Sequence, residues 1–315
     1  MDRFLNFKTG KAVFTMKRQY QHIIVIGVDG AGGFFAKAET PAFDRIFADG
    51  AQTYHALASN PTISAECWGS MLIGTSPKVH GLTNGWISEH PYPVDSDFPT
   101  VFRRIREADP DAELGAISCW NPINTGIIED DPKIFKFSAG DDDEVPVIEQ
   151  YIREKKPDFL FVQFDSVDGA GHGCGYGTKG HLDRIGVIDT FLDRIYNTIV
   201  ETGIADETLF IVLADHGGQG TGHGGWSDTE KYVTFAAKGK TVKQGHLDRV
   251  NVRDLASIIL YAYGLEAPEF LIGGWTSQIP AGLFADDAVP AYRDISEEED
   301  AAPRVSKVHH TSETV

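Results

Sequence analysis

Three continuous apolar runs, each leading into an aspartate, constrain the fold of this 315-residue chain more than any other feature. The runs span residues 22–28, 159–164 and 209–213, and Asp29, Asp165 and Asp215 come after them. Short runs of β-branched and aromatic residues without polar alternation predict strands that are buried on both faces, as in a parallel sheet covered by helices. Open α/β sheets bind their ligands outside the carboxyl ends of the strands, so we expect these aspartates to lie at a functional site.

The segments between the runs complete an α/β pattern. Apolar residues recur at helical spacing in several segments, and Thr40 and Pro41 are typical of a helix start. Helices are predicted over residues 41–50, 97–107, 142–154, 182–200 and 252–263, and further strands over 53–58, 113–119 and 232–237. We therefore predict a three-layer fold with a central, largely parallel sheet flanked by helices.

No composition break divides the chain into large domains. We predict an N-terminal arm over residues 1–20 and one catalytic domain over residues 21–285. Within that domain, residues 82–150 are expected to form a loop-rich cover of the site. Residues 286–315 are acidic and polar, so we predict a disordered tail.

The composition limits the classes of molecule that the protein is expected to bind. The 46 acidic and 28 basic residues give a formal charge of -18 at pH 7, which disfavours nucleic acid and anionic membranes as partners. A small-molecule substrate fits better. The three cysteines lack metal-type spacing, no apolar run approaches the ~20 residues of a membrane span, and residues 1–20 do not resemble a secretory signal. We expect a cytoplasmic protein, and the oligomeric state stays open.

Aspartate and histidine residues cluster on glycine-rich turns after the second and third runs. Asp168 precedes His172 by four residues, His216 follows Asp215, and His223 lies between two glycines. Carboxylate oxygens and neutral imidazole nitrogens together suit divalent metals. Taken singly, each residue also fits a helix cap, a turn or a satisfied polar group. Ser64 stands near a predicted helix start, where it either meets a bound anion or serves only as an N-cap.

Taken together and in this order, the clusters resemble the alkaline phosphatase superfamily, and most of all its type I phosphodiesterase and nucleotide pyrophosphatase family. The resemblance covers roughly residues 22–265. It is carried by five motifs, which are Val28-Asp29-Gly30, Pro61-Thr62-Ile63-Ser64 with Gly74, Pro77 and His80-Gly81, Asp168 to His172, Asp215-His216-Gly217 and Gly222-His223-Gly224.

This resemblance implies an alkaline phosphatase-like fold and two divalent metal ions. One ion would be held by Asp168, His172 and His223. The other would be held by Asp29, Asp215, His216 and the Ser64 oxygen. Zinc is usual in the family, and ligand type leaves manganese open. Asp165 is a rival for the role of Asp168, but its spacing to His172 is too long for the motif, so we expect it to support a ligand without binding the metal itself.

The implied activity is metal-dependent hydrolysis of phosphoric esters, and of phosphodiesters in particular. Ser64 would be the nucleophile and would form a covalent phosphoseryl intermediate. Cys67, Trp68 and Asn84 are candidates for substrate contacts, although the Cys67 thiol is a weaker donor than an amide. A phosphomonoesterase, a phosphonate hydrolase and an inactive metal-binding or sensor protein remain as alternatives. A sulfatase is disfavoured, because no Cys/Ser-x-Pro-x-Arg motif surrounds Ser64.

Overall fold

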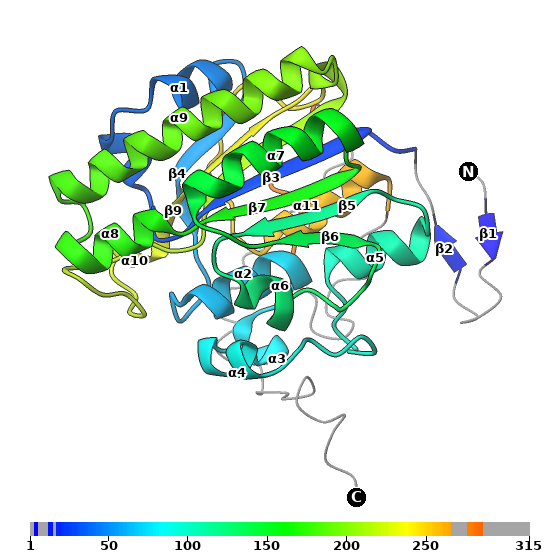
Figure 1. Ribbon diagram of the computed structural model, residues 1–315, viewed down its shortest axis with the longest axis horizontal. Helices are drawn as coiled ribbons and strands as arrows, with labels where there is room; N and C mark the ends of the chain where they lie inside the picture. Colours follow the sequence, from blue (N-terminus) through cyan, green and yellow to red (C-terminus); the bar gives the residue numbers. More distant parts are fainter. Residues whose placement is uncertain (1–2, 6–11, 15–16, 266–275, 286–315) are drawn as a thin grey trace, which may run out of the picture.

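The computed structural model describes residues 3–5, 12–14, 17–265 and 276–285, and within these its main sheet has eight strands (Figure 1). All neighbours are parallel except those of β9, which runs antiparallel to β4 and β8. Two short strands, β1 (Arg3–Leu5) and β2 (Ala12–Phe14), pair separately. From edge to edge the main sheet consists of β10 (Gly245–His246), β4 (Ala51–Leu57), β9 (Tyr232–Lys238), β8 (Thr208–Ala214), β3 (His22–Val28), β7 (Phe159–Phe164), β5 (Leu114–Ser118) and β6 (Ile134–Phe137).

Helices cover both faces of the sheet, which gives the predicted three layers (Figure 1). One layer contains α1 (Pro41–Phe47), α7 (Asp141–Lys155) and α9 (Lys179–Glu201), and the other contains α2 (Ser64–Ile73), α5 (Val101–Ala108) and α11 (Asp254–Tyr263). The other helices are η1 (Phe34–Lys37), α3 (Pro77–His80), α4 (Asn84–Glu89), α6 (Pro122–Gly126), α8 (Ser166–Cys174), η2 (Ala205–Glu207) and α10 (Asp228–Lys231).

The strand register places the site. Val28 at the end of β3 pairs with Phe164 of β7 on one side and with Ala214 of β8 on the other. The three central strands therefore end at one level, and the residue that follows each of them is an aspartate. The α/β fold class predicted from the apolar runs is confirmed, and α9 confirms the helix expected over residues 182–200.

Residues 82–150 contain more regular structure than a loop-rich cover, and part of it was expected, because α5, β5 and α7 correspond to the elements predicted over 97–107, 113–119 and 142–154. They contain helices α4, α5, α6 and α7 and strands β5 and β6. The physical reason is burial, because all five residues of β5 are buried and the strand extends the sheet beyond β7. Helix α5 begins at Val101 rather than at residue 97. The expected tail over residues 286–315 and half of the N-terminal arm lie outside the described residues.

Candidate active site and metal-binding side chains

The innermost side chains of the site are Asp29, Asp215 and His216, which we call the inner group. Each offers one ligand atom, and these atoms lie within 4.8 Å of one another. The level ends of β3 and β8 bring the two aspartates together. All three side chains are buried, with at most 1 % of their surface exposed.

Each inner carboxylate has one oxygen that accepts hydrogen bonds and one that accepts none. Asp29 Oδ2 accepts from Trp68 Nε1 at 2.9 Å and from Gln163 Nε2 at 3.1 Å. Asp215 Oδ1 accepts from the backbone N–H groups of Gly30 and His216. The remaining oxygens, Asp29 Oδ1 and Asp215 Oδ2, are buried and have no hydrogen-bond partner. Such orphan oxygens are costly to bury without a cation or a donor.

The His216 ring meets both orphan oxygens. Its Nε2 lies 3.5 Å from Asp29 Oδ1 and 3.3 Å from Asp215 Oδ2. Its Nδ1 lies 3.0 Å from the Gly217 carbonyl, which can only accept, so Nδ1 carries the proton and Nε2 presents a lone pair. Three electron-rich atoms thus face one another in a buried space, which is the donor set that a divalent cation requires.

Ser64 joins the inner group from α2. Its Oγ lies 3.2 Å from His216 Nε2. Ser64 is the first residue of the helix and Ile63 is the N-cap, so the N-cap interpretation of Ser64 is wrong. The peptide bond between Asn60 and Pro61 is cis. A helix N-terminus carries a partial positive charge, which favours anionic groups beside the Ser64 hydroxyl.

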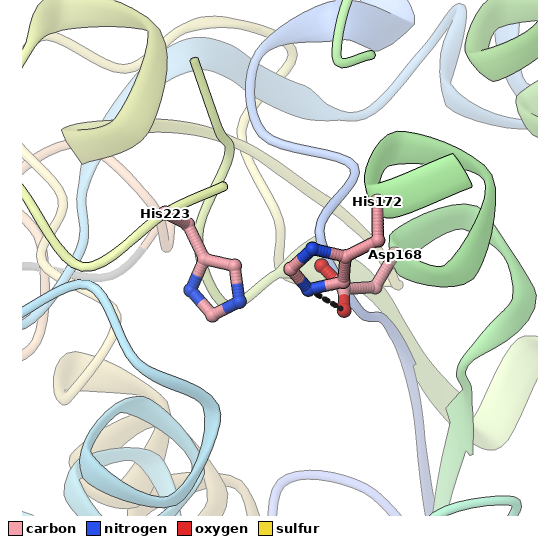
Figure 2. A group of neighbouring side chains, drawn as sticks. All are labelled: Asp168, His172 and His223. Carbon is pink, nitrogen blue, oxygen red and sulfur yellow. Dashed lines mark ion pairs between the residues drawn. The ribbon is translucent and has the colours of Figure 1, made fainter. Parts of the chain in front are cut away.

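Asp168, His172 and His223 form a second cluster, the outer group, whose ligand atoms also lie within 4.8 Å of one another. Figure 2 shows the three side chains pointing into a common space, with the ion pair between His172 Nε2 and Asp168 Oδ2 at 3.2 Å. Asp168 and His172 stand one turn apart on α8. The His172 side chain is 47 % exposed, so this group faces the mouth of the site.

The two groups adjoin each other. The His216 and His223 rings stack with their centroids 3.9 Å apart. Burial raises the pKa of Asp29 well above its ordinary value, and the neighbouring charge of Asp215 adds to this effect. Burial raises the pKa of Asp215 as well, and it lowers the pKa values of His216 and His223. Desolvation and like-charge repulsion both disfavour ionised carboxylates here, and a bound cation would relieve both.

Two of the three predicted substrate contacts are corrected. Trp68 is fully buried, and its ring fills the space beside Gly27, where a Cβ would come within 2.4 Å of it. Its indole orients Asp29 and does not contact substrate. Cys67 is also fully buried, with its Sγ 3.9 Å from the carbonyls of Ser59 and Pro61. A helix buried over its whole length explains both corrections.

Asn84 is exposed and lies beside the predicted nucleophile. Its Oδ1 accepts a hydrogen bond of 2.9 Å from the backbone N–H of Ala65, the residue after Ser64. That bond turns the amide NH2 group away from Ala65 and leaves two donors free of this contact. Asp165 belongs to neither group, and Gln163 Nε2 bridges it to Asp29.

The sequence interpretation missed three side chains that hold candidate ligands or the loop after His223 in place. Gln163 binds Asp29 and Asp165, Glu230 Oε1 accepts from Gly225 N at 2.7 Å, and Tyr176 donates to Asp168. Gln163 and Tyr176 belong to no motif, and the only signal for Gln163 was its position as a polar residue inside an apolar strand. Glu230 completes the Ser-x-x-Glu capping box that begins at Ser227, which was a signal in the sequence.

The fold is similar to that of solved hydrolases that include phosphodiesterases and sulfatases. Murine ectonucleotide pyrophosphatase/phosphodiesterase 5 has the same fold, with a TM-score of 0.66 and 15 % identity over 79 % of this chain and 96 % of that chain. The human protein of that name has a TM-score of 0.65 and 13 % identity over 79 % and 97 % of the two chains. The 2-O glycosaminoglycan sulfatase BT1596 has a TM-score of 0.62 and 14 % identity over 79 % and 72 %.

A family model narrows the class. Residues 116–265 match the type I phosphodiesterase / nucleotide pyrophosphatase family, which confirms the resemblance seen in the motifs and indicates a phosphoester hydrolase. The matched residues include the outer group, Asp215 and His216, whereas Asp29 and Ser64 precede them. Among curated proteins, none matches the chain in sequence. In the part of the chain that the structure describes, no helix is long and apolar enough to cross a bilayer.

Proposed function

We propose that the protein hydrolyses phosphodiesters by a two-step displacement with Ser64 as the nucleophile. One observation carries the proposal. Ser64 Oγ lies 3.2 Å from His216 Nε2, beside the orphan oxygens of Asp29 and Asp215. A hydroxyl in this place is presented to a reacting phosphorus by the same groups that would hold a cation. A serine that served only to cap α2 would have no reason to lie beside His216 and the two orphan oxygens.

Two divalent cations belong to the proposed enzyme, with Zn²⁺ as the first choice and Mn²⁺ as the alternative. The inner group with Ser64 would hold one, and the outer group would hold the other. Mixed carboxylate and imidazole donors suit both metals. When bound, such ions supply positive charge that lowers the pKa of a serine hydroxyl and stabilises charge on the phosphoryl oxygens.

The chain's own residues account for the first step. Ser64 Oγ gives its proton to solvent and forms a bond to phosphorus while the bond to the leaving alkoxide or aryloxide breaks, and solvent protonates the leaving oxygen. The positive end of α2 favours the phosphoryl oxygens. Asn84 is oriented by Ala65 N, so its amide N–H groups are available to a nonbridging oxygen. The products of this step are an alcohol and phosphoseryl-64 that still carries the second ester.

Water completes the reaction. Its oxygen attacks phosphorus, the bond to Ser64 Oγ breaks, and Ser64 recovers its proton as the phosphomonoester leaves. The exposure of His172 places the open side of the site at the outer group, where water and the leaving group are exchanged. The buried side chains of the inner group keep their positions through both steps.

Diesters are favoured over monoesters on grounds of charge. The motif segments that carry the site contain no Arg or Lys, and a monoester dianion needs more positive charge than a diester monoanion. An inactive variant of murine ectonucleotide pyrophosphatase/phosphodiesterase 5 forms a complex with AMP, which supports nucleotide esters as one group of candidate substrates. The three free cysteines support the cytoplasmic location.

The test compares two serine variants of α2. Ser64→Ala should lower the turnover of bis-p-nitrophenyl phosphate by several orders of magnitude and retain most bound metal. Ser70→Ala is the matched control, because Ser70 lies on the same helix and its Oγ donates to the Glu66 carbonyl instead of facing the site. Its turnover should stay within about threefold of wild type.

Three results would count against the proposal. If Ser64→Ala kept more than about a tenth of wild-type turnover, direct attack by water would be the better mechanism. A wild-type preference for p-nitrophenyl phosphate over the diester would indicate a phosphomonoesterase. If the protein carried no divalent metal and did not respond to zinc or manganese, the site would not be catalytic in this way.

A further inference from the structure

Tyr176 lies in the turn between α8 and α9, outside every motif. Gly175 and Gly177 on either side of it adopt positive φ angles of 98° and 74°. The backbone N–H of Tyr176 donates to the Gly220 carbonyl at 2.8 Å, which ties this turn to the loop that carries His223. The side chain is only 8 % exposed. A tyrosine so deeply placed needs a partner for its hydroxyl.

The ring occupies a space that two glycines leave open. A Cβ added to Gly171 or to Gly218 would come within 2.4 Å of the Tyr176 ring. The ring also meets His172 and His223 edge-on, with centroids 5.7 Å and 6.3 Å apart. The ring is therefore clamped by α8 on one side and by the segment after β8 on the other. Its hydroxyl has little freedom to move.

That hydroxyl donates to Asp168 Oδ1 at 2.5 Å. The other oxygen, Asp168 Oδ2, is the one that faces His172 Nε2. The two histidines of the outer group are held in an analogous way, because His172 Nδ1 bonds to the Thr221 carbonyl and His223 Nδ1 bonds to the Thr62 carbonyl, both at 2.8 Å. A carbonyl only accepts, so each Nδ1 is the donor and each Nε2 presents a lone pair.

In each member of the outer group, one polar atom is fixed by a hydrogen bond and the other faces the common space. Backbone carbonyls fix the two histidines, whereas a side chain fixes the aspartate. We propose that Tyr176 is a positioning residue for the outer group. Its hydroxyl occupies Asp168 Oδ1, so that Oδ2 is presented to a divalent cation held with His172 and His223. This inference rests on the proposed function, because it assumes that the outer group binds a metal.

The consequence is measurable as metal affinity. Partners that orient a ligand in this way commonly change metal affinity 10–100-fold when they are removed. Tyr176→Phe keeps the ring and removes only the hydroxyl, so Asp168 is free to turn and to offer both oxygens. We expect 10–100-fold weaker binding at the outer group and unchanged binding at the inner group, which Tyr176 does not contact.

The experiment uses the full chain, with free Zn²⁺ set by chelator buffers and bound zinc counted per chain. Tyr151→Phe is the matched control. Its hydroxyl also donates to a carboxylate, Glu113 Oε1 at 2.8 Å, and its ring is also buried, but it lies between α7 and β5. Tyr151→Phe should bind both ions as the wild type does. The absorption spectrum of the Co²⁺-loaded protein should change for Tyr176→Phe and not for Tyr151→Phe.

A double-mutant cycle guards against a merely structural effect. In an Asp168→Asn background, Tyr176→Phe should cause no further loss of zinc affinity, because the carboxylate that it orients is gone. If Tyr176→Phe alone left the zinc titration and the Co²⁺ spectrum unchanged while the wild type bound two ions, the role of Tyr176 would be refuted and the proposed function would stand. A wild type that bound neither zinc nor manganese would refute both.

Discussion

The inner and outer groups have the same kinds of ligand but are built in opposite ways. The inner aspartates follow directly from two paired strands and are buried, and the sheet register alone brings them together. The outer residues come from a short helix and a glycine-rich loop, and His172 is half exposed. In the inner group, the strands hold buried carboxylates close together at an electrostatic cost. In the outer group, the orientation of the side chains depends on individual hydrogen bonds. Substitutions should therefore affect the two groups differently.

The largest difference should appear in turnover. Asp215→Asn keeps the shape of an inner ligand and removes its charge, and we expect kcat/KM for bis-p-nitrophenyl phosphate to fall about a thousandfold or more, since metal charge contributes several kcal/mol. His172→Gln should cost less, about 10–100-fold, because water can reach an exposed position and replace a lost ligand. Bound metal should be counted for both variants. Equal losses would show that the groups are equally rigid.

The stability of the metal-free protein should show the second largest difference. Burial raises the pKa of Asp215 to about 8, above its ordinary value of 3.8. Between these pH values the folded chain holds a proton that the unfolded chain has released. Asp215 therefore contributes a fall in the free energy of unfolding as pH rises from about 4 to about 8, whereas the lowered pKa values of His216 and His223 act in the opposite direction below their ordinary value of 6.5.

Urea denaturation with a chelator at several pH values measures this slope. Asp215→Asn should make the slope shallower, because the titrating group is gone, and saturating Zn²⁺ should remove it for the wild type, since a cation replaces the proton. If Asp215→Asn had the same slope as the wild type, the pKa of Asp215 would not be raised in the folded protein.

The same contrast explains what the sequence alone can predict. Apolar runs such as residues 22–28 are long enough to indicate buried strands, and parallel strands end at a common edge. Asp29 and Asp215 can therefore be placed together from the amino-acid order. Asp168 and His172 are paired through the family motif and expected on a glycine-rich turn, whereas the structure places them four residues apart on one face of α8. Ser64 can be placed at a helix start, though one residue away from its observed position in α2.

Side-chain partners and burial cannot be predicted in the same way. An aromatic residue near a nucleophile suggests a substrate contact for Trp68, but whether its ring points inward depends on Gly27, which lies on another element. No pattern in the sequence predicts the role of Tyr176, because its hydroxyl meets Asp168 only through the fold of α8 and the turn that follows it. Strand β5 is predictable, yet the shape of residues 82–150 depends on pairing with β7 over a long separation.

Gly30 connects the two groups and offers a way to separate them. Its N–H donates to Asp215 Oδ1, and a Cβ at this position would come within 2.4 Å of Asp168 Oδ1. Its φ angle of 67° also disfavours other residues. Gly30→Ala should cost about 1–3 kcal/mol of stability and displace Asp168, with loss of zinc from the outer group first.

Gly169→Ala is the control for Gly30→Ala. Gly169 adjoins Asp168 in sequence and lies inside α8, but a Cβ there would meet nothing within 4 Å. Alanine is favoured over glycine in a helix by about 0.5–1 kcal/mol, so this variant should be slightly more stable and should bind zinc normally. Thermal melting and zinc counts distinguish the two. If both variants bound zinc equally, Gly30 would not couple the groups.

The smallest expected effect concerns Trp226, three residues after His223 on the exposed side of the site. Its side chain is 40 % exposed, and Glu230 accepts hydrogen bonds from the backbone N–H groups of Gly225 and Ser227 on either side of it. The same loop bonds to Thr62, two residues before Ser64. A fixed backbone with an exposed indole suits stacking against an aromatic leaving group.

Removal of this indole should therefore affect binding of an aryl ester rather than the chemical step. We expect Trp226→Ala to raise KM for bis-p-nitrophenyl phosphate about three- to tenfold and to leave kcat and the KM for a methyl diester nearly unchanged, as one aromatic pair contributes about 0.5–1.5 kcal/mol. Val200→Ala is the control, because Val200 is exposed near the C-terminal end of α9, and it should change neither constant. A fall in kcat for both esters would instead place Trp226 in the support of His223, and the outer group would then be more rigid than its exposure suggests.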